Sequence, residues 1–201
     1  TEVCAGCHSM DLLSYRNLIE EGGPEFSKEQ AKAMAAMFET EGGPNEDGEM
    51  FMRPAILSDR FVSPWENEQQ ARAANGGAYP PDLSVIVKAR EGGADYIYSL
   101  LIGYEDPPND MSLDDGVYYN IYAKGNKIAM PQPLYEDGVE YTDGTVATPE
   151  QMAHDVTMFL TWAAEPKLEA RKRIGFKVIS YLIILSFLLY FTNRRIWKDS
   201  H

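Results

Sequence analysis

The sequence predicts a mainly α-helical protein with two parts, an acidic head at residues 1–165 and a basic C-terminal segment at residues 166–201. Three observations predict this class. Helix-forming stretches with N-terminal capping residues recur between pairs of glycine and proline. The sequence contains no long alternating run of the kind that predicts a strand, and one uninterrupted apolar run lies near its C-terminal end. We therefore expect a head of short helices and long loops, followed by a single transmembrane helix.

The first two helices of the head are predicted from their capping residues. In residues 27–38, Ser27 is followed three positions later by Gln30, which is a capping-box pattern, and strong helix formers follow. In residues 82–90, Asp82 supplies an N-cap and basic side chains occupy the last turn. We expect both segments to be helical along their whole length.

The remaining elements of the head follow in order. Residues 94–102 predict a short helix. Residues 148–164 predict the longest helix of the head, with Thr148 as N-cap, a proline next to it and Gln151 closing a capping box. Strand signals are weak, and only a small hairpin is expected at 139–144.

The apolar run covers residues 174–191 and contains one charged side chain, Lys177. A bilayer core requires about 20 mostly apolar residues in a helix, and a lysine near the end of such a helix reaches outward to the headgroups. A buried helix of a water-soluble core would instead show a polar stripe at every third or fourth position. The run therefore predicts a helix that spans a lipid bilayer once.

The distribution of charge also divides the chain between the head, residues 1–165, and the C-terminal segment, residues 166–201. The net charge is -13, from 18 basic and 31 acidic residues. Residues 166–201 contain eight basic and two acidic residues, which leaves ten and 29 for residues 1–165, a net charge of -19. A head this acidic repels the phosphates of nucleic acids and favours a basic protein partner. Acidic residues gather in two stretches: Glu39, Glu41, Glu46, Asp47 and Glu49, and Glu105, Asp106, Asp110, Asp114 and Asp115.

The chemistry of the head is indicated by its only two cysteines, in the sequence Cys4-Ala5-Gly6-Cys7-His8. This pattern is the attachment signature of c-type haem. Two thiols on one helical turn can add to the two vinyl groups of one porphyrin edge, and His8 then lies below the ring. A redox-active thiol pair would need a βαβ context, and a zinc site would need two further ligands. We therefore expect one covalent haem c, with the long loops wrapped around it.

The second axial ligand of the iron has several candidates. Met130 is favoured because Pro131 and Pro133 stiffen the segment that follows it, and a residue before proline is held in extended geometry. A His/Met pair raises the reduction potential and suits electron transfer. The alternatives are His154, which lies in a predicted helix, and Met34, Met37, Met50, Met52, Met152 and Met158.

The chain as a whole resembles the cytochrome c1 family, the haem subunits of the ubiquinol–cytochrome c oxidoreductase (cytochrome bc1) complex. The matching stretches are VCAGCHSM at the start, GPNEDGEMFMRP at 43–54, ARAANGGAYPPDLSVIVKAR at 71–90, KIAMPQP at 127–133, and EYTDGTVATPEQMAHDV with FLTWAAEP up to 166. The resemblance covers essentially all 201 residues. It implies Cys4 and Cys7 as thioether attachments, His8 as proximal ligand and Met130 as distal ligand.

The resemblance also implies residues around the haem. Arg90 pairs with a haem propionate, which suits a guanidinium that offers a fork of donors. Asn75, Pro80, Pro81 and Tyr96 line the haem crevice. One of the two proline carbonyls fixes the tautomer of the proximal histidine, and the sequence does not choose between them.

The function that the resemblance implies is one-electron transfer without side-chain catalysis. The electron comes from the Rieske iron–sulfur protein and goes to a soluble or membrane-bound basic c-type cytochrome, within a dimeric complex that also holds cytochrome b. The protein would cross the inner membrane once, with the head in the periplasm or mitochondrial intermembrane space and the C-terminus in the cytoplasm or matrix. Family members carry residues before the signature, so we expect the native chain to continue before Thr1. The competing classes are a free-standing membrane-anchored cytochrome and a haem sensor or enzyme with an open sixth position.

Overall fold

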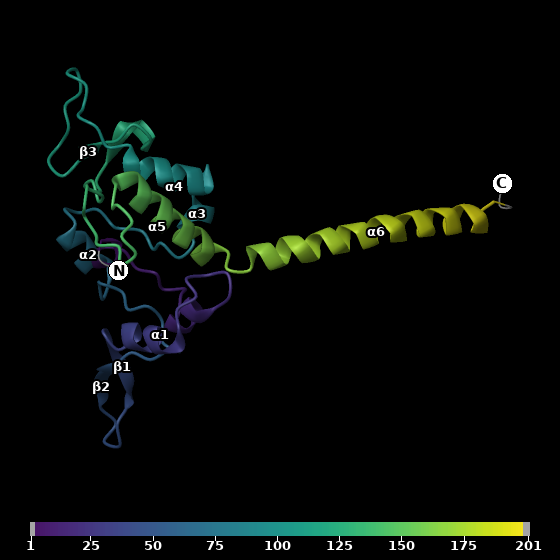
Figure 1. Cartoon of the computed structure of the whole chain (residues 1–201), viewed down its shortest axis with the longest axis horizontal. Coiled ribbons are helices and arrows are strands. Elements are labelled where there is room, and N and C mark those ends of the chain that lie inside the picture. Colours follow the sequence, from purple (N-terminus) through teal and green to yellow (C-terminus); the bar gives the residue numbers. More distant parts are fainter. Residues whose placement is uncertain (1–2, 199–201) are drawn as a thin grey trace. The chain divides into compact units, whose positions relative to one another are not determined.

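A computed structural model describes residues 3–198. They form two compact units, which meet in the sequence between Pro166 and Lys167. Residues 1–2 and 199–201 of the two predicted parts lie outside the described residues. The described chain is mainly helical, with short helices and long loops, as predicted (Figure 1).

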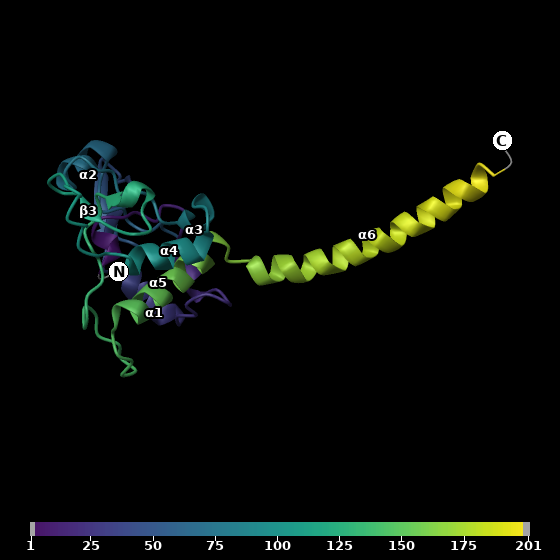
Figure 2. The same cartoon turned by 90° about the horizontal axis from the view of Figure 1, so that it is seen from above.

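In the described part of the head, residues 3–166, the structure has five α-helices and three short 3₁₀ helices. Figures 1 and 2 show α3, α4 and α5 side by side, and their packed faces form one of the apolar clusters of the head. The α-helices are α1 (Lys28–Ala35), α2 (Glu68–Ala74), α3 (Ile86–Ala89), α4 (Gly93–Ile102) and α5 (Pro149–Ala164), and the 3₁₀ turns are η1 (Cys4–Gly6), η2 (Tyr15–Ile19) and η3 (Lys124–Asn126).

Two antiparallel hairpins complete the head, and the sequence predicted neither. The first pairs β1 (Glu39–Pro44) with β2 (Met50–Pro54), and the second pairs β3 (Tyr118–Tyr119) with β4 (Lys127–Ile128). The hairpin expected at 139–144 is wrong. A turn closes there, but the chain before it packs against the core of the head instead of pairing as a strand.

The capping signals at the ends of α1 and α5 are confirmed with one exception. The Ser27 hydroxyl accepts a hydrogen bond from the backbone amide of Gln30, and the Gln30 side-chain oxygen accepts one from the backbone amide of Ser27, so the box at α1 is complete. Thr148 caps α5 by accepting from the backbone of Gln151 at 3.2 Å. The Gln151 side chain does not close that box, because it donates to Asp155 at 2.9 Å.

The helix predicted at 82–90 is shorter than expected and begins four residues late, at Ile86. The reason is that Asp82 does not act as an N-cap. Its carboxylate accepts hydrogen bonds from Ser9 and from the backbone of Asp11, more than 70 positions away in the chain, as well as from the backbone of Ser84. These long-range contacts hold residues 82–85 in turns.

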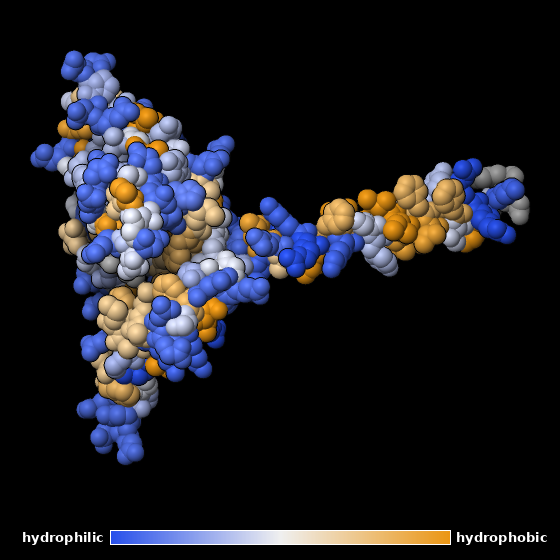
Figure 3. Space-filling model, viewed as in Figure 1, coloured by the Kyte–Doolittle hydropathy of each residue, from blue (hydrophilic) through white to orange (hydrophobic). Residues whose placement is uncertain are grey.

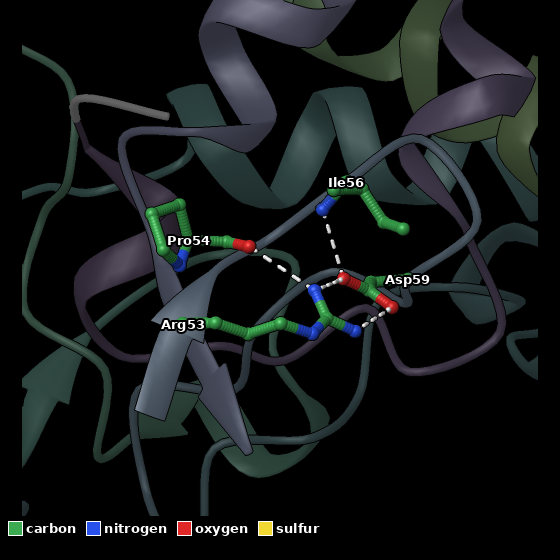
Figure 4. A network of polar contacts seen from close by, with 4 residues as sticks. All are labelled: Arg53, Pro54, Ile56 and Asp59. Carbon is green, nitrogen blue, oxygen red and sulfur yellow. Dashed lines mark hydrogen bonds and ion pairs between the residues drawn. The ribbon is translucent and has the colours of Figure 1, made fainter. Parts of the chain in front are cut away.

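The first hairpin is fastened to the loop that follows it by one ion pair. Arg53 on β2 donates to both carboxylate oxygens of Asp59, at 2.6 and 3.0 Å, and Asp59 also accepts from the backbone of Ile56 at 2.8 Å (Figure 4). The hydrogen bonds from Arg53 and Ile56 lower the pKa of Asp59. A bidentate pair of this kind fixes direction as well as distance.

The second unit is dominated by α6 (Leu168–Ile196), which contains the predicted apolar run. Within residues 3–198 it is the one helix long and apolar enough to cross a membrane. Figure 3 shows hydrophobic side chains along its middle and hydrophilic ones at both ends. The serine and threonine hydroxyls of the helix bond to carbonyls four residues earlier, which hides their polarity within the helix.

Candidate functional site

The haem signature forms one tight turn at the start of the described chain. The backbone amides of Cys7 and His8 both donate to the carbonyl of Cys4, at 3.2 and 3.0 Å, within and just after η1. Cys4 is half-buried, and this burial raises the pKa of its thiol, whereas Cys7 is exposed. The indole of Trp65 donates to the carbonyl of Cys7 at 3.0 Å and fastens the turn to a distant loop.

The imidazole of His8 is held by the backbone of Pro81. Its Nδ1 lies 2.8 Å from the Pro81 carbonyl oxygen. A carbonyl only accepts hydrogen bonds, so Nδ1 carries the proton and Nε2 keeps its lone pair for a metal. Of the two prolines that the sequence left open, the structure has this contact at Pro81 and not at Pro80.

The segment after the signature is tied along its length to the segment that contains Pro81. The Asp82 carboxylate accepts from the hydroxyl of Ser9 at 2.9 Å and from the backbone of Asp11 at 2.7 Å, and the hydroxyl of Ser84 accepts from the next amide, Leu12, at 3.1 Å. Burial acts to raise the pKa of Asp82, but the hydrogen bonds it accepts outweigh burial and lower it. We call this row of hydrogen bonds between residues 8–12 and 81–84 the polar seam, and the imidazole of His8 lies at one end of it.

Met130 is half-buried and lies two residues beyond β4, in the segment that its two neighbouring prolines restrict. Its carbonyl accepts a hydrogen bond from the hydroxyl of Tyr104 at 3.1 Å. The alternative ligand His154 is exposed on α5, with its ring 3.3 Å from Asp155. Four of the alternative methionines are also largely exposed: Met37, Met50, Met52 and Met158.

The remaining predicted residues occupy separate places on the head. Arg90 is exposed at the end of α3 and donates to the carbonyl before it at 3.2 Å. Asn75 is half-buried at the end of α2 and donates back to that helix at 2.7 Å. Tyr96 packs on α4 in the cluster that also contains Met10. Among residues 3–198, no hydrogen bond joins Arg90 or Met130 to the signature.

Three residues around the candidate site were missed by sequence reasoning. Trp65 holds the Cys7 carbonyl, Tyr104 holds the Met130 carbonyl, and Asn120 is fully buried in the loop that leads to β4. Trp65 and Tyr104 lie far along the chain from the residues whose carbonyls they hold, and none of the three belongs to a recognisable motif. A buried asparagine cannot be distinguished from an exposed one by residue type alone.

The donor set suits a haem c better than a bare metal ion. It combines two thiols on one turn, an imidazole with a free Nε2 and a thioether on a proline-restricted segment. The part of the chain that the structure describes contains no group of three histidine, cysteine, aspartate or glutamate side chains placed to hold a metal ion. The chemistry of the available residues therefore fits a covalently held porphyrin.

Comparison with known proteins identifies the family of the chain. A family model described as the Cytochrome C1 family matches residues 1–200. The chain belongs to the cytochrome C1 family. Its relatives in this family come from plants, fungi and bacteria, and the match extends through α6, so family membership covers both units of the chain.

Three cytochrome C1 relatives illustrate the range. A protein of Arabidopsis thaliana named "Cytochrome c1 2, heme protein, mitochondrial" is 53% identical over 195 residues, which are 97% of this chain and 62% of the relative. A Candida albicans protein named "Cytochrome b-c1 complex catalytic subunit, mitochondrial" is 50% identical over 98% of this chain and 67% of its own length. The "Cytochrome c1" of Rhodospirillum rubrum is 44% identical over 98% of this chain and 78% of the relative. The chain thus spans about 62% of the length of the Arabidopsis relative.

Proposed function

We propose that this chain carries one haem c, attached through thioethers from Cys4 and Cys7, and transfers single electrons within a cytochrome bc1 complex. The observation that carries the proposal is the hydrogen bond between His8, the last residue of the attachment signature, and the carbonyl of Pro81. Because this bond occupies Nδ1, it leaves Nε2 as the ligating nitrogen. The names of the relatives support it, since one is called a heme protein and another a subunit of the b-c1 complex.

The axial ligands in this proposal are His8 and Met130. When bound, the haem supplies an iron that changes its charge by one electron. The protein side chains hold that iron and make no bonds to a substrate. Arg90 would pair with a propionate, and the crevice would be lined by Asn75, Pro80, Pro81 and Tyr96.

The partners in this proposal follow from charge and from the helix α6. The Rieske iron–sulfur protein would supply electrons, and a basic c-type cytochrome would accept them, because the head has a net charge of -19 from its ten basic and 29 acidic residues. Residues 166–201 would anchor the head in the inner membrane beside cytochrome b, in a dimeric complex. The head would face the periplasm or intermembrane space.

The attachment chemistry is tested by removing both thiols. We expect the wild-type chain, expressed with the machinery for c-type haem attachment, to keep its colour when denatured and extracted with acidified acetone. The Cys4→Ala/Cys7→Ala double variant should release all of its haem under the same treatment, because no thioether would remain. The pyridine haemochrome spectrum of the denatured protein gives the second readout. A wild-type chain that surrenders its haem to the solvent would contradict the proposal.

A further inference from the structure

Two attachments at the C-terminal end of α4 help to hold the segment that carries Met130. One is the hydrogen bond from the hydroxyl of Tyr104, which lies two residues past α4, to the carbonyl of Met130 itself, at 3.1 Å. The other is the loop 120–126, which joins β3 to β4 and so sets where the strand before Met130 begins.

Asn120 is the centre of that second attachment and is fully buried. Its side-chain amide donates to the carbonyl of Leu100 in the last turn of α4 at 2.7 Å. Its side-chain oxygen accepts from the backbone amides of Tyr122 and Ala123, at 3.0 and 3.2 Å. The amide of the next residue, Ile121, donates to the carbonyl of Gly103 at 2.9 Å. The side-chain nitrogen of Asn120 thus binds the helix and its side-chain oxygen binds the loop, so this one residue joins the two.

Gly103 shows how close this approach is. A β-carbon at this position would lie 2.5 Å from the ring of Tyr122, 2.9 Å from the carbonyl of Ser99 and 3.0 Å from the side-chain oxygen of Asn120. The loop can therefore lie against the end of α4 only because residue 103 has no side chain. In turn α4 is held by its packing against α3 and α5 in one apolar cluster.

We infer that Tyr104 is a positioning residue for the thioether of Met130, acting through the Met130 carbonyl while Asn120 holds the preceding loop. The inference rests on the proposed role of Met130 as an axial ligand. Proline at 131 keeps Met130 extended, and the hydrogen bond to its carbonyl fixes the orientation of the following peptide plane. Together these restraints leave the Met130 side chain with only its own torsions to adjust.

The test uses imidazole as a probe that competes with Met130 for the iron of the oxidised, haem-loaded full-length chain in detergent. An external ligand binds only when the thioether has left, so its apparent affinity reports the fraction of open sites. Tyr104→Phe removes one hydroxyl and keeps the ring. Because a neutral hydrogen bond contributes about 1 kcal/mol, the dissociation constant of imidazole should fall roughly two- to tenfold.

A double-variant cycle separates positioning from general loosening of the head. Met130→Leu should bind imidazole far more tightly than the wild type, and adding Tyr104→Phe to it should change nothing further, because the residue acts only through Met130. Tyr141→Phe is the matched control. It removes a tyrosine hydroxyl that donates to Asp155 on α5, at 2.7 Å, and not to the backbone of Met130, and it should leave imidazole affinity unchanged.

The outcomes are distinct. An unchanged affinity in Tyr104→Phe, with the expected increase in Met130→Leu, would overturn the inference and leave the proposed function intact. The same holds if Tyr104→Phe tightens binding equally in the Met130→Leu background, since this would show a loosened crevice. If Met130→Leu itself has no effect on imidazole binding, the ligand assignment fails and the inference fails with it.

Discussion

Both proposed ligands of the haem iron are oriented through a backbone carbonyl. The Nδ1–H of His8 donates a hydrogen bond to the carbonyl of Pro81, and the carbonyl of Met130 accepts a hydrogen bond from the hydroxyl of Tyr104. A backbone carbonyl has a fixed place in the chain, so each of these hydrogen bonds ties a proposed ligand to the path of the main chain. The two ligands are therefore held by the fold itself.

At the level of single residues, replacing Met130 with leucine should lower the midpoint potential of the haem by roughly 100 mV or more, because axial ligands are a strong determinant of haem potentials. Leucine has a similar volume but no sulfur, so packing changes little. A spectroelectrochemical titration measures the midpoint. Met37→Leu serves as control, because that side chain is 80% exposed and should give the wild-type potential. An unchanged midpoint in Met130→Leu would exclude this residue as ligand.

Asp82→Asn should weaken the polar seam beside His8 and lower the free energy of unfolding by about 1–2 kcal/mol at pH 7. The folded-state pKa of Asp82 is lowered, so its contribution is fully present above the unfolded value of about 3.9 and is lost as the pH falls through the folded value. The difference between wild type and variant should therefore shrink below about pH 4. Denaturant titrations from pH 7 to pH 3 measure it, with the exposed Asp47→Asn as control. A difference that grew toward acid would contradict this assignment.

At the level of elements, the loop 120–126 packs closely against the end of α4 at Gly103. Gly103→Ala should lower the free energy of unfolding by about 1–3 kcal/mol, because the added methyl group must displace the ring of Tyr122 or the amide of Asn120. Gly43→Ala is the matched control, since its β-carbon would have no neighbour within 4 Å. Thermal or denaturant unfolding of both variants decides the point. Equal free energies of unfolding in the two variants would contradict the prediction, because they would show that the loop moves aside for the added methyl group at no cost.

The elements differ in how far the sequence predicts them. The start of α5 follows from Thr148, because its cap is a local contact that residue types reveal. The hairpin of β1 and β2 could not be predicted, since the segment Glu39–Pro44 contains no apolar residue and two glycines. Likewise, nothing near Asp82 indicates that its carboxylate bonds to residues more than 70 positions away.

The residues of the candidate site also differ in how far the sequence predicts them. The thiols and His8 are predictable because their chemistry depends on adjacent positions, and Met130 is favoured by its neighbouring prolines. Tyr104 and Asn120 are not predictable, because their function depends on where the chain returns after a long loop. Sequence therefore suggests which atoms would touch the cofactor, and structure is needed to find what holds them.

At the level of the whole molecule, charge should govern the encounter with an electron acceptor. The two acidic stretches named above are exposed, the first on and beside the β1–β2 hairpin and the second in the loop after α4. Electron transfer to a basic c-type cytochrome should slow as ionic strength rises, since opposite charges at the surface are screened by salt. Stopped-flow rates measure this dependence. A rate that is flat or increases with salt would contradict a charge-guided encounter.

Charge reversal tests which of the two acidic stretches meets the proposed acceptor. Two triple variants, Glu46→Lys/Asp47→Lys/Glu49→Lys and Asp110→Lys/Asp114→Lys/Asp115→Lys, change the net charge equally. The variant that alters the docking surface should lose roughly tenfold or more in rate at low ionic strength, and the other should lose much less. Equal losses would show that only the total charge matters.

The distribution of methionine burial has a consequence for oxidative damage. Met37, Met50, Met52 and Met158 are between 56% and 80% exposed, whereas Met130 is half-buried. Thioether sulfur is converted to sulfoxide by peroxide, and access by the oxidant sets the order. The peripheral sulfurs would therefore react first, and the head would gain several oxygen atoms before the proposed ligand is altered. Under peroxide, sulfoxide should therefore form at these four surface positions while the proposed ligand keeps its sulfur.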